Sequence, residues 1–267
     1  MEFIFTIEFL FKIAAGFSVG FVIGMTGVGG GSLMTPILVL GFNIQPTVAV
    51  GTDLLYAAIT KSVGVFAHQK QSNIKWKVVS LLCIGSIPAS LISLFIIKQL
   101  NNSGINYDGL ILNTLSFAMI LTAIFLIFRS QWQKLSKDQH FAFMKVLHSK
   151  YTDAFTIFAG ILIGTLVTFS SVGAGVIGAA FLFFLYPKYK TIEIVGTDLA
   201  HAIPITAIAG IGHANLGTVD YVLLFSLIVG SLPGIYLGSH VGGLIPDNIM
   251  RTILASMLLV IGILLVQ

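Results

Sequence analysis

Two short sequence elements place an acidic residue well inside an apolar segment. Gly51-Thr52-Asp53 and Gly196-Thr197-Asp198 each lie about seven residues into their segments. At about 1.5 Å per helical residue, each carboxyl group is then about 10 Å from the segment end. A carboxylate so deep in a membrane is costly and is usually kept for an ion or proton pathway. Gly followed by Thr and Asp is also typical of a helix N-cap, so each element equally predicts the start of a half-helix, and the two interpretations are compatible.

Glycine-rich runs begin two shorter apolar segments, at 24–32 and 170–175. Glycines leave backbone N–H groups uncovered, and exposed amides at a helix N-terminus suit an anion in a low-dielectric medium. The residues that we predict to bind substrate are Gly29, Gly30, Gly31, Ser32, Thr52, Ser171, Gly173, Ala174, Gly175 and Thr197. The alternative is close helix packing, which accounts for Gly16, Gly20, Gly24, Gly160 and Gly164.

Titratable residues accompany the two acids. His201 follows Asp198 by three residues, so it lies within one turn and can change charge near neutral pH. Lys61 lies eight residues beyond Asp53 and is expected either to pair with a neighbouring acid or to take part in coupling. The residues that we predict to couple transport to protons or ions are Asp53, Asp198, His201 and Lys61. His68 and His213 fall at segment ends, where caps are commoner than proton relays.

Motifs of catalysis, metal binding and cofactor binding do not occur. The sequence has no HExxH, Walker, Cys/His zinc or Gly-x-Ser-x-Gly pattern, and Cys83 is its single cysteine. We therefore expect no cofactor, no metal site and no enzyme activity.

The composition indicates a membrane environment for all of these residues. Of the 267 residues, 56% are apolar and only 9% are charged, which is too little polar surface for a water-soluble globule. Long apolar runs between short polar joints favour spanning helices over a barrel of alternating strands. This composition excludes secreted, disordered and nucleic-acid-binding proteins. The net charge of +4 comes from Lys and Arg in the joints, which is the usual orientation signal of a membrane protein.

Ten apolar segments divide the chain, at about 3–26, 28–42, 46–67, 76–97, 109–128, 152–170, 172–187, 191–212, 219–243 and 247–266. The second and seventh have about 15 residues and reach about 22 Å of a roughly 30 Å hydrocarbon core, so they span or re-enter as short or broken helices. The predicted fold is an all-α polytopic membrane protein of two homologous repeats, each of about five segments, whose short helices meet at the membrane midplane.

The repeat is indicated by a constant offset of 145 residues. The GTDL tetrapeptide, His68 and the Gly85-Ser86-x-Pro88 element each recur at that distance, as GTDL at 196–199, His213 and Gly230-Ser231-x-Pro233. Lys and Arg lie in opposite joints of the two halves, which predicts that the second repeat is inverted. We expect an N-terminal transmembrane repeat at 1–128, a basic cytoplasmic linker at 129–151, and a C-terminal transmembrane repeat at 152–267. Both termini are expected outside.

A family resemblance rests on these residues. GFVIGMTGVGGGSLMTPIL followed by VAVGTDLLYAAITKSVGVFAH, with SVGAGVIGAAFL and IVGTDLAHAIPIT in the second half, resembles the TauE/SafE family, the sulfite exporter or TSUP group of membrane proteins. The resemblance covers nearly the whole chain and implies transport of sulfite, sulfonates and related organosulfur anions across a bacterial-type inner membrane. The resemblance implies that the Gly-rich runs and the two GTD elements line the substrate pathway. Ala174 departs from Gly30 at the matching position, so the second amide cradle is expected to be less open.

We expect a secondary transporter of a small anion that works by alternating access. Four helix starts, at Gly29, Thr52, Gly173 and Thr197, are predicted to aim N–H groups at the substrate. One alternative is a cation or proton transporter that uses the paired Asp residues, and an alternative of another class is an intramembrane enzyme with Ser32 or Ser171 near His201. The partners expected are a small anion and the lipid bilayer, with no nucleic acid. A homodimer is left open.

Overall fold

The computed structural model is all-helical in the residues that it describes, 7–26, 31–70, 74–135, 142–241 and 247–265. In the first half, these residues form α1 (Ile7–Thr26), α2 (Gly31–Pro36), the π-helical turn η1 (Ile37–Gly41), α3 (Pro46–Lys70), α4 (Trp76–Asn102) and α5 (Asp108–Leu135). In the second half, they form α6 (Ala142–Ser170), α7 (Val176–Leu185), α8 (Thr191–Asn215), α9 (Tyr221–Val241) and α10 (Asp247–Leu264). The ten predicted apolar segments correspond to these elements, with α2 and η1 together forming the second. The polar stretch 129–151 is helical at both ends, where α5 continues to Leu135 and α6 begins at Ala142.

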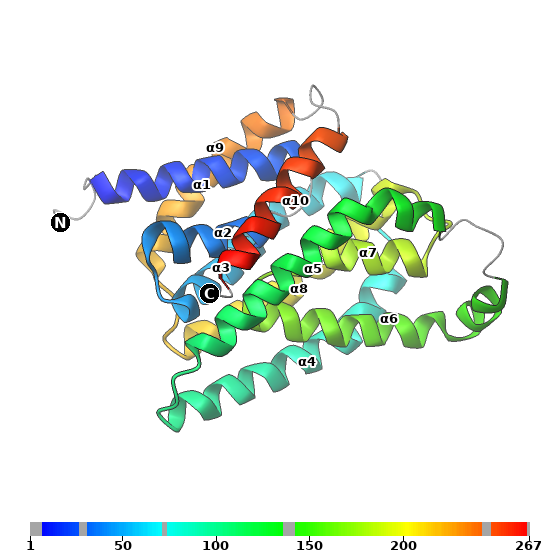
Figure 1. The fold of residues 1–267 in the computed structure, drawn as a ribbon, viewed down its shortest axis with the longest axis horizontal. Coiled ribbons are helices and arrows are strands. Elements are labelled where there is room, and N and C mark those ends of the chain that lie inside the picture. The colour runs from blue at the N-terminus through cyan, green and yellow to red at the C-terminus, as the bar shows by residue number, and fades with distance from the viewer. Residues whose placement is uncertain (1–6, 27–30, 71–73, 136–141, 242–246, 266–267) are drawn as a thin grey trace.

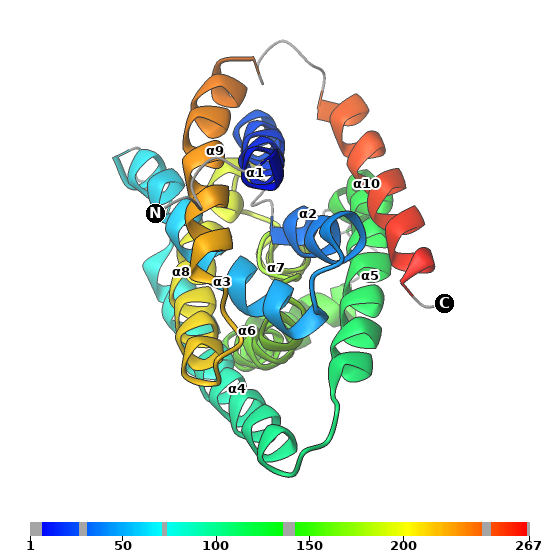
Figure 2. The same ribbon diagram turned by 90° about the vertical axis from the view of Figure 1, so that its left-hand side faces the viewer.

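Two short helices are enclosed by longer ones. Figure 2 looks along the bundle and shows α2 and α7 inside a ring that includes α1, α9, α10, α5, α6, α4 and α8. At 10 residues, α7 is about 15 Å long and does not cross a hydrocarbon core alone. The short segments therefore belong to the interior of the molecule.

The pairs α1 with α9 and α4 with α6 pack closely because glycines remove side chains from their interfaces. A Cβ atom on Gly16 or Gly20 would overlap the backbone of Leu227 or Ser231 on α9. In the same way, a Cβ atom on Gly160 or Gly164 would overlap the backbone of Leu82 or Ser86 on α4. The packing role expected for these glycines is confirmed.

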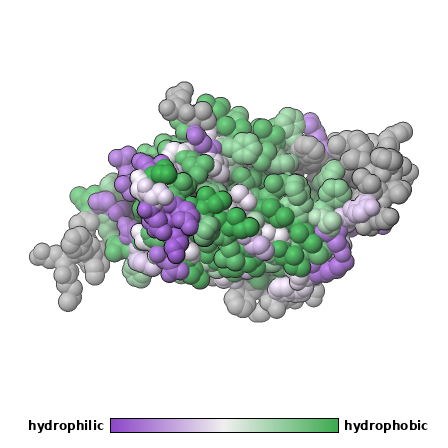
Figure 3. Space-filling model, turned by 90° about the horizontal axis from the view of Figure 1, so that it is seen from below, coloured by the Kyte–Doolittle hydropathy of each residue, from purple (hydrophilic) through white to green (hydrophobic). Residues whose placement is uncertain are grey.

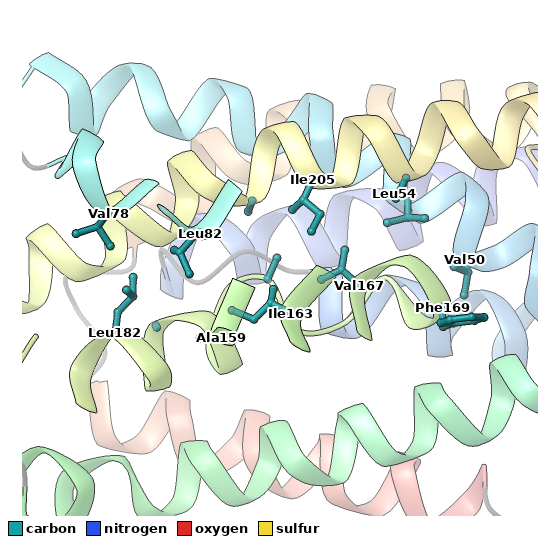
Figure 4. Packing of buried hydrophobic residues seen from close by; sticks show 14 of the residues in the cluster. Val50, Leu54, Val78, Leu82, Ala159, Ile163, Val167, Phe169, Leu182 and Ile205 are labelled. Carbon is teal, nitrogen blue, oxygen red and sulfur yellow. The ribbon is translucent and has the colours of Figure 1, made fainter. Parts of the chain in front are cut away.

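An apolar core joins α3, α4, α6, α7 and α8. Figure 4 shows side chains from several of these helices meeting, including Leu54 of α3, Leu82 of α4, Ile163 of α6 and Ile205 of α8. All four are fully buried. This packing fixes α3 and α8, which carry the two acids, against the rest of the bundle.

The outer surface is suited to lipid. Figure 3 shows one face, on which an apolar band separates hydrophilic groups at the two ends of the long axis. Large apolar side chains are exposed on α4 and α6, among them Ile92, Phe95, Phe155 and Phe158. Six helices of the described part of the chain are long and apolar enough to span a membrane, namely Ile7–Met25, Trp76–Asn102, Asp108–Phe128, Tyr151–Ser170, Thr191–Asn215 and Tyr221–Val241.

The two ends of the molecule differ in charge. At one end, Lys75 forms an ion pair of 2.7 Å with Glu193, and Lys77 forms one of 2.9 Å with Asp153. Hydrogen bonding to the Glu193 carboxylate raises the pKa of the Lys75 ammonium. The opposite end, where α4 and α8 finish, holds a polar pocket between the connections.

In Figure 1, α1 runs from left to right and α6 from right to left, and α5 and α10 also run in opposite directions.

Candidate functional site

Asp53 and Asp198 lie inside continuous helices, each about two turns from the helix start. Both carboxyl groups are almost entirely buried, with 0% and 2% of each residue exposed. The N-cap prediction for the two GTD elements is wrong, because α3 begins at Pro46 and α8 at Thr191, one to two turns earlier. Pro46 suits the first turn of α3, because a backbone N–H at that position would have no acceptor within the helix. The acids are therefore side chains of helix interiors and not caps.

Asp53 is held by α2 and by the connection between α6 and α7. The Thr35 hydroxyl of α2 donates a 2.5 Å hydrogen bond to Asp53 Oδ2. The Ser171 side chain lies beside the same carboxyl group. Among the described residues, Asp53 Oδ1 and Ser171 Oγ are buried and form no other hydrogen bond. The carboxyl group therefore lies in a polar setting made by two hydroxyl groups.

Lys61 brings a buried ammonium to the two acids. Only 3% of the residue is exposed, and its Nζ donates a 2.9 Å hydrogen bond to the Ala174 carbonyl oxygen. Both Asp53 and Asp198 lie within electrostatic range of this ammonium. The ion pairs found among the described residues do not include it, so direct pairing with a neighbouring acid, one of the two roles expected for Lys61, does not occur. The carbonyl takes the place of the acid because the α6–α7 connection passes closer to Lys61 Nζ.

Asp198 packs against the first turn of α7. A Cβ atom on Gly178 would overlap Asp198 Oδ1, so this glycine makes room for the carboxyl group. Asp198 Oδ1 is buried without a hydrogen-bond partner within the structure. The position near the positive end of a helix dipole favours the ionised acid over the same acid in plain hydrocarbon.

His201 lies one turn beyond Asp198 and is fully buried. Its Nε2 lies 2.9 Å from Ser86 Oγ of α4. Its Nδ1 is buried and unpaired in the structure. Tyr56, which occupies the position 145 residues earlier, is fully buried too. The imidazole therefore links α4 to the region of Lys61, with which it interacts electrostatically.

The connection 171–175 is an irregular backbone segment buried in the protein. Ser171, Gly173 and Gly175 have φ values of 58°, 126° and 132°, and at the last two a side chain would be strained. Ser170 Oγ stabilises the turn by accepting a 3.2 Å hydrogen bond from the Val172 amide. Non-helical backbone at membrane depth occurs where protein or a cavity surrounds it. The expected helix start at Gly173 is wrong by three residues, since α7 begins at Val176.

Thr52 and Thr197 are engaged at the two ends of the bundle. Thr52 Oγ1 accepts a 3.0 Å hydrogen bond from the Asp220 amide, just before α9. Thr197 Oγ1 accepts a 3.0 Å hydrogen bond from the Lys75 amide, just before α4. The expectation that these positions are helix starts with free amides is wrong, because both lie inside helices whose N–H groups face earlier carbonyls.

The remaining predicted residues belong to the first glycine-rich run. Gly29 and Gly30 lie outside the described residues. Gly31 is the first residue of α2, and Ser32 follows it, with a side chain that lies outside the described part.

Several site residues were missed by sequence reasoning. Thr35 and Gly178 carry no signal of their own in an apolar segment. Ser86 did belong to the repeated Gly-Ser-x-Pro element, which was interpreted only as a sign of duplication. In the part of the chain that the structure describes, no group of three or more His, Cys, Asp or Glu side chains is arranged to hold a metal ion.

Comparison with known proteins identifies the family of the chain. The family model described as sulfite exporter TauE/SafE matches residues 12–265. The probable membrane transporter protein YjnA of Bacillus subtilis is 36% identical, over 95% of this chain and 98% of its own length. The probable membrane transporter protein YdhB of the same organism is 29% identical over 93% and 96% of the two chains. A probable membrane transporter protein of Methanocaldococcus jannaschii, MJ0441, is 29% identical over 98% and 97%. No solved structure matches the chain.

Proposed function

Because the chain belongs to the sulfite exporter TauE/SafE family of membrane transporter proteins, we propose that it moves a small sulfur-containing anion, sulfite or an organosulfonate, across the membrane together with protons. The family is one of transporters and not of enzymes. The observation that carries the proposal is the buried ammonium of Lys61 in the centre of the bundle, bonded to a backbone carbonyl.

Lys61 supplies the positive charge that an anion needs inside the membrane. An ammonium has three N–H donors, and the Ala174 carbonyl takes one of them. A sulfonate or sulfite oxygen can accept from the others and would gain a charge-assisted hydrogen bond. Ser171, whose hydroxyl lies beside the Asp53 carboxyl group, can donate to the same anion.

The charges of the site support coupling to protons. With Asp53, Asp198 and Lys61 all ionised, two negative charges face one positive charge, and the sum is −1. An anion added to that site would bring it to −2 in a medium where an unpaired charge is costly. If both acids take up protons, the sum becomes +1 and the anion neutralises it. Anion binding and proton uptake therefore favour each other.

The packing supports two inverted repeats that move relative to each other. Glycines make the contacts between α1 and α9 and also those between α6 and α4. The two sets of contacts lie at positions that match between the halves at offsets of 144 and 145 residues. The hydrogen bond from the Asp220 amide to Thr52 has a counterpart from the Lys75 amide to Thr197. Residues 52 and 197, and likewise residues 75 and 220, are 145 positions apart. Opposite helix directions fit inversion, and inverted repeats are a common basis of alternating access.

A second candidate is a cation or proton transporter in which the two acids bind the ion directly. The unpaired oxygen atoms Asp53 Oδ1 and Asp198 Oδ1 favour it. In that case Lys61 would be displaced from the acids by the cation, and no anion would stabilise the protein.

The test uses purified protein and then proteoliposomes. We expect sulfite or a sulfonate such as methanesulfonate to raise the thermal unfolding temperature, whereas Na⁺ and K⁺ as chlorides leave it unchanged. Asp53→Asn and Asp198→Asn should fold, keep anion binding, and lose the acceleration of uptake by a proton gradient. Stabilisation by the cations alone, or undiminished proton-driven uptake in both variants, would contradict the proposal.

A further inference from the structure

We propose that a line of buried hydroxyl and imidazole groups carries protons from the polar pocket at the end of α4 and α8 to Asp198. The inference rests on the proposed proton-coupled function and adds the route by which protons reach the site. The groups, in order from the pocket inwards, are Thr218, His213, Thr168, Ser90, Ser86 and His201.

The pocket gives water access to the outer end of the line. It has a volume of about 420 Å³ and lies between the connections before α3, between α4 and α5, and after α8. Polar groups that line it include Thr47, Asn106, Asp108 and Thr218. Thr218 is therefore shared between the pocket and the interior.

His213 forms the first inward contacts. Its Nδ1 lies 2.9 Å from Thr218 Oγ1, and its Nε2 lies 3.1 Å from the carbonyl oxygen of Thr168. The carbonyl only accepts hydrogen bonds, so Nε2 carries a proton and Thr218 donates to Nδ1 when the ring is neutral. A second proton can be added at Nδ1, because the Thr218 hydroxyl also has the His213 carbonyl as an acceptor at 3.0 Å. His213 is fully buried, so this proton exchange takes place out of contact with lipid.

Hydroxyl groups continue the line toward the centre. Thr168 Oγ1 lies 2.8 Å from Ser90 Oγ, and both residues are fully buried. Ser86 is one turn from Ser90 on α4, about 6 Å along the axis, so the proposed route requires one water molecule between the two hydroxyls. A water is also needed between His213 Nε2 and the Thr168 hydroxyl, since the carbonyl cannot pass a proton on. Each hydroxyl accepts one proton and releases its own, so no net charge remains on the line.

His201 receives the proton and passes it to the acid. Ser86 Oγ lies 2.9 Å from His201 Nε2, and the unpaired Nδ1 is the atom from which a proton leaves toward Asp198, one turn earlier on α8. The charged group that acts on His201 is Lys61 of α3, which is itself within electrostatic range of Asp53 and Asp198. Near the outer end, Asp108 and Tyr107 line the pocket and Asp220 follows Thr218 by two residues.

The related positions in the other half lack the Thr168 and Ser90 hydroxyls and the His201 imidazole. The residues 145 positions from Ser90 and His201 are Ile235 and Tyr56, and the residue that the glycine spacing pairs with Thr168 is Gly24. There the helices α1 and α9 meet through Gly24 against the backbone of Ile235. Close packing of two helices at this point therefore does not by itself require the Thr168 to Ser90 hydrogen bond.

The test measures proton movement in proteoliposomes with a pH-sensitive dye inside, and uses methanesulfonate as the transported anion. A sulfonate stays ionised at neutral pH, so protons that enter with it are carried by the protein. Thr168→Val and Ser90→Ala remove the hydroxyls with little change of shape. We expect each to lower anion-driven proton uptake at least tenfold, while methanesulfonate still raises the unfolding temperature. Thr168→Ser retains the hydroxyl and should keep the coupling. Thr122→Val is the matched control, because that buried hydroxyl bonds only to Ala118 of its own helix.

The outcomes separate the route from the proposed function. Undiminished proton uptake in both Thr168→Val and Ser90→Ala, with a coupled wild-type protein, overturns the route alone. Wild-type transport of methanesulfonate without protons overturns coupling and the route together. If the wild type moves no methanesulfonate, the proposed substrate class fails and the route loses its basis. If Thr168→Val does not fold, Ser90→Ala and Ser86→Ala decide, because each removes a single hydroxyl from α4.

Discussion

Lys61 Nζ of α3 donates a 2.9 Å hydrogen bond to the carbonyl oxygen of Ala174, 113 residues away in the connection between α6 and α7. The contact ties the buried cation of the first half to the irregular backbone of the second half. An anion that draws the ammonium toward itself competes with this carbonyl, so binding at Lys61 acts directly on the α6–α7 connection.

Replacing Lys61 by methionine tests its role in anion binding. Lys61→Met keeps the length of the side chain and removes the charge, so the anion loses a charge-assisted hydrogen bond of about 1.5–3 kcal/mol, or about 10- to 150-fold in affinity. Isothermal titration with sulfite and methanesulfonate measures this loss. Lys98→Met, an exposed position of α4, is the control and should bind as the wild type does. Equal affinity of Lys61→Met and Lys98→Met for these anions would show that Lys61 does not bind the anion.

Gly178 is expected to be essential because Asp198 occupies the space of its missing side chain. Gly178→Ala places a methyl group where Asp198 Oδ1 lies, and such overpacking costs about 1–3 kcal/mol. We expect transport to fall while the protein still inserts. Gly109→Ala in the first turn of α5 meets no neighbouring atom and should be neutral or slightly stabilising. Uptake assays and thermal unfolding on both variants measure the contrast, and normal transport by Gly178→Ala would show that Asp198 needs no fixed position.

Thr52 and Thr197 are expected to stabilise the bundle without binding substrate. Thr52→Val and Thr197→Val each leave a backbone amide before α9 or α4 without its acceptor. The cost should be about 0.5–1.5 kcal/mol in unfolding free energy, with anion affinity unchanged. Thermal unfolding with and without methanesulfonate separates the two effects. A variant that has normal stability but no longer binds the anion would contradict this prediction and show that the threonine binds substrate.

The orientation in the membrane follows from the two ends of the molecule. Ser103 and Asn215 are exposed near the polar pocket, whereas Lys188 is exposed near the ion pairs of Lys75 and Lys77. Because Lys and Arg favour the cytoplasmic side, Ser103→Cys and Asn215→Cys should label only from outside, and Lys188→Cys only from inside. The native Cys83 is first replaced by alanine. Labelling of Asn215→Cys and Lys188→Cys from the same side would contradict this orientation.

The sequence by itself determined the helical segments, the enclosed acids and the family. Hydrophobic runs are long and local, so each predicted segment coincides with a helix, including the two short ones near α2 and α7. The acids Asp53 and Asp198 were recognisable because a charge in an apolar run is rare. The offset of 145 residues was visible for the same reason, since polar residues stand out in such a chain.

Only the tertiary structure decided what each polar residue contacts. The Gly-Thr-Asp pattern is a local signal of an N-cap, yet α3 and α8 begin earlier, and Thr52 bonds instead to an amide 168 residues away. The partners of Lys61, Asp53 and His201 are Ala174, Thr35 and Ser86, which lie on other elements of the bundle. A helix is fixed by hydrogen bonds between residues four apart, so its pattern can be read along the chain. Contacts between helices depend on which faces meet, and here that is set by glycines and small side chains whose effect appears only when the helices are packed.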